Sequence, residues 1–160
     1  MSRSWPLFVA VSTATLVGCN PFHHADPVQV SAKDQTLNTR WHANLASPAD
    51  LAGAVQMNGS ASMAPAGSRG TTVLLDLANA TPGGKHPWAL HRGQCGSDQG
   101  LVGSAGAYPV AEVGRDGHAT SSASLPIEAP TSGSYFVTVA ASAANEAVVV
   151  ACGNLAPPTL

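Results

Sequence analysis

Cysteine and histidine are the residue types of this chain that offer the most chemistry. The sequence holds three cysteines and six histidines. Thiols form disulfides, carry lipids or bind metal ions, and imidazoles are common ligands of copper and zinc. Neither Cys95 nor Cys152 lies in a Cys-x-x-Cys or Cys-x-x-His spacing, which disfavours a zinc site built on both thiolates. The sequence shows no Ser-His-Asp order, no recognisable pair of catalytic carboxylates and no phosphate-binding loop.

The first cysteine, Cys19, closes a short apolar segment. Arg3 precedes an apolar stretch over residues 5–17, which is too short to span about 30 Å of hydrocarbon as a permanent helix. The segment ends in Leu16-Val17-Gly18-Cys19 and resembles the signal peptide of bacterial lipoproteins. The resemblance implies that residues 1–18 are removed and that Cys19 receives a lipid such as palmitate. An ordinary signal peptide with a chance cysteine is the alternative.

The residue after Cys19 bears on the final location of such a lipoprotein. In the class that this motif resembles, an Asp directly after the cysteine tends to retain the protein at the inner membrane. Asn20 occupies that place here. The resemblance therefore implies a protein of the bacterial cell envelope that is anchored in the outer membrane and faces the periplasm.

Cys95 and Cys152 remain as a pair once Cys19 carries lipid. An exported domain folds in an oxidising compartment, so we expect a disulfide between them. Two free thiols are the alternative.

The polar segment 19–38 contains Pro21 and Pro27 and shows no sustained apolar period, which indicates a flexible tether between lipid and domain. His23 and His24 lie in it, and two adjacent imidazoles without further ligands would hold a metal ion only weakly. The folded domain is predicted over 39–160, and this length suits one core but not two.

Short β-prone runs separated by Gly, Pro, Asn and Asp predict an all-β domain, either a sandwich or a barrel. In residues 71–77 the alternation points Val73, Leu75 and Leu77 inward, because a one-residue slip would bury Asp76. The predicted strands cover 55–63, 71–77, 88–92, 110–113, 118–125, 135–141 and 147–152. Trp41 is expected near the edge of the folded unit.

One histidine precedes the run that begins at Trp88, and a second one lies within that run. In a regular strand His86 and His91 would point to opposite faces and lie roughly 17 Å apart. A metal ion shared by the two therefore requires an irregular segment at Pro87. The alternative is that His86 caps the preceding turn and that His91 packs near the disulfide. His118 follows Asp116-Gly117 and is expected on an exposed turn.

Several of these runs, taken in order, look like strands of the Cu/Zn superoxide dismutase family. The resemblance covers roughly residues 55–155 and implies a Greek-key β-sandwich or flattened barrel of about eight strands. It also implies the intrasubunit disulfide between Cys95 and Cys152. The segments that carry it are Val55-Gln56-Met57-Asn58-Gly59-Ser60, Thr72-Val73-Leu74-Leu75-Asp76-Leu77, Thr81-Pro82-Gly83, Leu90-His91-Arg92-Gly93-Gln94-Cys95 and Val150-Ala151-Cys152-Gly153-Asn154.

Most metal ligands of that family have no histidine at the matching positions. The His-x-His pair corresponds to Ala89-Leu90-His91, so only His91 survives. The loop histidine falls near Tyr108 and the late-strand histidine near Ala140. The zinc-binding loop has no counterpart, and Glu146 supplies a negative charge where the family has an arginine. One imidazole does not support copper redox cycling.

These losses favour a non-enzymatic domain with a binding or structural role, anchored to the membrane by lipid. The enzymatic alternative is a copper-only superoxide dismutase that converts superoxide to oxygen and hydrogen peroxide. A weak copper or zinc buffer that uses His23, His24, His86 and His91 is a third possibility. The formal net charge of −2 and the absence of a basic patch argue against nucleic acid as a partner. No protein partner is indicated.

Overall fold

A computed structural model describes residues 40–51 and 53–158, and these residues confirm the all-β prediction. They contain ten strands and two short 3-10 turns, with no α-helix in the described ranges. The strands are β1 (Trp41–Ala46), β2 (Asn58–Ala66), β3 (Gly70–Ala78), β4 (Lys85–His86), β5 (Trp88–Gln94), β6 (Ser97–Leu101), β7 (Ala111–Glu112), β8 (Ala119–Leu125), β9 (Tyr135–Ser142) and β10 (Asn145–Leu155); the 3-10 turns are η2 (Ala49–Leu51) and η3 (Ala105–Ala107).

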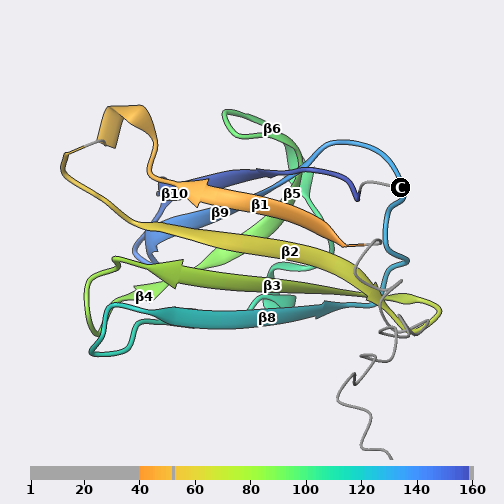
Figure 1. Cartoon of the computed structure of the whole chain (residues 1–160), viewed down its shortest axis with the longest axis horizontal. Coiled ribbons are helices and arrows are strands. Elements are labelled where there is room, and N and C mark those ends of the chain that lie inside the picture. Colours follow the sequence, from red (N-terminus) through yellow and green to blue (C-terminus); the bar gives the residue numbers. More distant parts are fainter. Residues whose placement is uncertain (1–39, 52, 159–160) are drawn as a thin grey trace, which may run out of the picture.

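Eight strands form one antiparallel sheet in the order β6-β5-β9-β10-β1-β2-β3-β8. The sheet curls, so that β1, β2, β3 and β8 lie in front of β5, β9 and β10 in the view of Figure 1. β4 and β7 form a separate two-stranded sheet, with an exposed ion pair of 2.7 Å between Lys85 and Glu112. The arrangement is sandwich-like, and the inward side chains of its two halves share one core.

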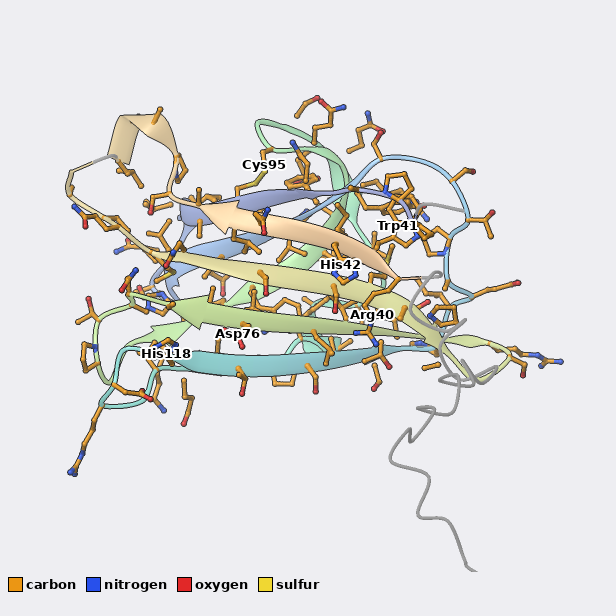
Figure 2. The ribbon with its side chains drawn as sticks, in the orientation of Figure 1. Arg40, Trp41, His42, Asp76, Cys95 and His118 are labelled. Carbon is orange, nitrogen blue, oxygen red and sulfur yellow. A yellow bond between two sulfur atoms is a disulfide. The ribbon has the colours of Figure 1, made fainter. Side chains whose placement is uncertain are left out.

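The predicted register of β3 is confirmed. Val73, Leu75 and Leu77 are at most 2% exposed, and the intervening Asp76 lies on the outer face of the sheet, as Figure 2 shows. Alternation of this kind buries one face of each strand and leaves the other to solvent. In β9 Val137 lies in the core with no exposed surface, but Phe136 on the opposite face is buried as well.

The first strand, β1, is missing from the sequence-based prediction, which put Trp41 at the edge of the folded unit. β1 is an interior strand with β10 on one side and β2 on the other. The Trp41 indole N–H donates to the carbonyl of Pro130 at 3.1 Å, and the ring packs edge-on against Tyr135. Short strands β4 and β6 were also not predicted, and β2 begins at Asn58 rather than at Val55.

Trp88 and Tyr108 anchor the other end of the core. Their rings pack edge to face with centroids 5.3 Å apart, and both side chains are buried. The Trp88 indole N–H donates to the carbonyl of Pro109 at 2.7 Å and to the hydroxyl of Ser121 at 2.9 Å. These contacts tie β5 and β8 together across the core, so the aromatic residues serve packing rather than an exposed docking patch.

No helix within the described residues has the length and apolar character that crossing a membrane requires.

Candidate functional site

The predicted disulfide is present between Cys95 and Cys152. The sulfur atoms lie 1.99 Å apart and the Cα atoms 6.0 Å apart. Cys95 follows β5, and Cys152 lies in β10, next to Thr138 of β9 in the register. The backbone N–H of Cys95 donates to the side-chain oxygen of Asn154 at 2.8 Å. The bridge therefore fixes the end of β5 against the C-terminal strand.

A cleft of about 540 Å³ lies on the outer face of β5 and β9. Strand alternation explains which side chains reach it, because residues two apart on a strand share a face. Ala89 and His91 of β5 face it, and so do Thr138 and Ala140 of β9. The register pairs Ala89 with Thr138 and His91 with Phe136.

His91 is held in the wall of this cleft by two contacts. Its ring packs on Phe136 with centroids 5.2 Å apart. Its Nδ1 lies 3.0 Å from Oδ2 of Asp98, and the imidazole side chain is 17% exposed. Nδ1 is buried without a well-aligned hydrogen-bond partner, so we describe the contact with Asp98 as electrostatic.

Asp98 stands at the rim of the cleft on β6. Its Oδ1 accepts a hydrogen bond of 2.7 Å from the backbone N–H of Gly100. That bond lowers the pKa of the Asp98 carboxyl, burial opposes this shift in part, and the neighbouring His91 lowers the pKa further. The carboxylate is therefore ionised at neutral pH and gives the rim a fixed negative charge.

Glu146, at the start of β10, gives the same cleft a second carboxylate. Its side chain is exposed. None of the described residues that line the cleft is a lysine or an arginine.

Tyr108 contributes its ring to the cleft, while its hydroxyl is already engaged. The hydroxyl donates to the backbone carbonyl of Val102. Burial raises the pKa of Tyr108 to about 12, so the phenol stays protonated and is a poor metal ligand at neutral pH.

The four positions that the superoxide dismutase resemblance assigns to copper ligands are Ala89, His91, Tyr108 and Ala140, and all four line this one cleft. Only His91 among them has an imidazole. No group of three or more His, Cys, Asp or Glu residues within the described ranges is placed to hold a metal ion. Copper(II) favours several nitrogen ligands, and this donor set does not fit it.

His86 lines a different cavity, of about 360 Å³. Its Nδ1 lies 3.0 Å from the carbonyl of Ala140, and its Nε2 is buried without a partner. A Cβ added to Gly84 would lie 2.8 Å from that Nε2, so the glycine lets the preceding turn close over the ring. His86 and His91 thus line different cavities. The described residues offer no common space in which the two imidazoles could hold the shared metal ion that the sequence suggested.

The remaining predicted residues are either exposed or lie outside the described ranges. His118 is exposed on its turn, as expected, where its backbone N–H donates to Asp116, and Figure 2 shows it at the end of the molecule opposite Trp41. Cys19, His23 and His24 fall in residues 1–39, which the structure does not describe. The predictions of a lipid, a tether and a weak metal site there stay predictions.

Asp98 is not among the site residues that the sequence predicts. The residue lies in the segment Gly96-Ser97-Asp98, which resembles an ordinary turn. Its role depends on the pairing of β5 with β6, which aligns Gly93 with Asp98 and His91 with Leu101. The only available signal was the proximity of a carboxylate to His91 across a tight hairpin.

Comparison of the chain with models of known protein families and with curated protein sequences finds no match to either.

Proposed function

We propose that this chain is a lipid-anchored domain of the bacterial cell envelope that has a superoxide dismutase-like scaffold and serves in binding rather than in catalysis. The observation that carries this proposal is the cleft between β5 and β9. It gathers the four positions that the superoxide dismutase resemblance assigns to copper ligands, and three of those positions have no imidazole.

The strand order supports the scaffold part of the proposal. β1, β2 and β3 follow one another as neighbours, and β8 pairs with β3. Between them the chain crosses to β5, which pairs with β9 at the other end of the sheet. A chain that leaves one half of the sandwich after β3 and returns to it at β8 is typical of Greek-key sandwiches. The disulfide from the end of β5 to the last strand is a further shared feature.

The chemistry of the cleft supports the non-catalytic part. A copper centre that cycles between two oxidation states needs several ligands of fixed geometry and an open position for its substrate. Here His91 is the one imidazole, and it is occupied by contacts with Asp98 and Phe136. The carboxylates of Asp98 and Glu146 would also repel a superoxide anion.

Metal analysis of protein exported to the periplasm tests this proposal. We expect the soluble part of the chain from Asn20 onward, which lacks the lipid-bearing Cys19, to contain less than about 0.1 equivalent of copper. It should bind added Cu(II) no more tightly than about 1 μM, since one imidazole gives little affinity. Elemental analysis and a chelator competition measure both values. A one-to-one complex of higher affinity, with dismutase activity that His91→Ala abolishes, would instead establish a copper-only superoxide dismutase.

The anchor is tested on the complete chain. We expect the protein in the membrane fraction, because a lipid group with two or more acyl chains holds a protein firmly to a bilayer. We also expect intact-mass spectrometry to find a mature N-terminus at Cys19 that carries acyl chains. Cys19→Ser is the matched control and should leave the protein unacylated. Soluble, unacylated wild-type protein would refute the anchor without affecting the copper result.

A further inference from the structure

The polar groups that line the cleft between β5 and β9 are acceptors of hydrogen bonds. Asp98 and Glu146 are carboxylates, which accept and do not donate when ionised. The Asp98 carboxylate beside Nδ1 of His91 favours the tautomer with the proton on Nδ1. That tautomer leaves an acceptor lone pair on Nε2 of the ring.

The donors among the lining side chains are already used within the fold. The indole N–H of Trp88 is shared by Pro109 and Ser121. The hydroxyl of Tyr108 is engaged with Val102. Among the described residues that line the cleft, the Thr138 hydroxyl is the remaining donor, and a hydroxyl accepts as readily as it donates. A ligand that hydrogen-bonds to this lining must therefore bring its own donors.

Charge and surface lead to the same class of ligand. Two carboxylates face the cleft, and none of its described lining residues is basic. Most of the other lining side chains are apolar, Leu101, Ala140 and Val149 among them. The volume of about 540 Å³ lies in the ordinary range for a small-molecule site.

We propose that this cleft binds a small organic cation, an ammonium or guanidinium group on an apolar body. The cation lies between Asp98 and Glu146, and its apolar part covers Ala140 and Val149. Asp98 keeps acceptor capacity for this contact, because a carboxylate has about four lone-pair sites and here accepts one hydrogen bond, from Gly100. The inference rests on the proposed function in one respect, which is that copper does not occupy the cleft.

The test uses n-hexylamine as a probe, with hexanoate and 1-hexanol as probes of equal chain length and different charge. We expect n-hexylamine to bind with a Kd of about 1 mM, as befits a fragment of this size, and to shift the backbone NMR signals of Ala89, Thr138 and Ala140. The other two probes should bind at least about fivefold more weakly, because neither brings a positive charge.

Variants separate the acidic rim from general electrostatic attraction. Asp98→Asn with Glu146→Gln should weaken n-hexylamine about tenfold, and the carbonyl oxygen of the introduced amide can still accept the bond from Gly100. The matched control is Asp50→Asn with Glu128→Gln, which removes the same two charges at residues outside the cleft and should leave the Kd unchanged. Equal binding of 1-hexanol, an unaltered Kd in the rim variant, or shifts confined to other surfaces would overturn the inference. Copper content is measured on the same sample. Bound copper would mean that the proposed function fails, whereas copper-free protein that does not bind n-hexylamine would refute only this inference.

Discussion

Replacement of both Cys95 and Cys152 by serine is expected to lower the free energy of unfolding by about 4 kcal/mol. The two cysteines are 57 residues apart in the sequence, and closing a loop of that length removes much of the entropy of the unfolded chain. A loss of this size is a large fraction of the stability of an ordinary domain. Urea unfolding of the double variant and the wild type, followed by tryptophan fluorescence, measures the difference.

The matched control for this prediction is the wild-type protein under reducing conditions. It should unfold at nearly the same urea concentration as the double variant, because both lack the bridge and keep the surrounding packing. If the double variant were as stable as the oxidised wild type, the bridge would contribute nothing to the free energy of unfolding and the prediction would be wrong. The geometry of the cleft in the folded protein should change little when the bridge is lost, since β5 stays paired with β9.

Introduction of two histidines, Ala89→His and Ala140→His, is expected to raise the affinity for Cu(II) at least about 100-fold, which is about 2.7 kcal/mol. Residues two apart on β5 share a face, and residues diagonal across a strand pair lie about 7–8 Å apart. The new side chains would therefore face the same cleft as His91. Three imidazoles suit copper, whereas one does not. Competition with a coloured copper chelator measures the affinity.

Two control variants make this result specific to the cleft. Asn44→His with Ser124→His adds two imidazoles on exposed positions of β1 and β8 and should change the affinity little. Addition of His91→Ala to the cleft variant should remove most of the gain, since that removes one of the three ligands. If the cleft variant bound copper no better than the exposed control, Ala89 and Ala140 would not occupy the positions of copper ligands, and the superoxide dismutase resemblance would lose its main support.

The register is most readable from sequence in β3, where the inward residues are large and alternate regularly. In β3 the spacing of Val73, Leu75 and Leu77 gives the register directly, because any shift would bury Asp76. β1 alternates as regularly as β3, but it is only six residues long and one of its three inward residues is the small Ala43. It is stabilised by partners on both sides, Met63 of β2 and Cys152 of β10 among them, which lie far away in the sequence.

The candidate site was predictable only in part, for a related reason. The matching of Ala89, His91, Tyr108 and Ala140 to one set of positions came from the order of motifs along the chain, and the structure brings these residues to one cleft. The acidic rim was not predictable as a unit. Asp98 lies in β6 and Glu146 lies at the start of β10. Their common location depends on the pairing of β5 with β6 and of β9 with β10, which local sequence patterns do not specify.

The segments that enter β1 and leave β10 lie side by side, which has a practical consequence for fusing or coupling the protein to something else. The chain enters β1 beside the end of β10, where His42 and Ala156 exchange backbone hydrogen bonds, and Figure 1 shows the C-terminal end near the start of β1. Trp41 also packs on Tyr135 at the beginning of β9. A fusion before Arg40 and a fusion after Ala156 would therefore hold the domain by the same corner, and a linker that joins the two positions could be short.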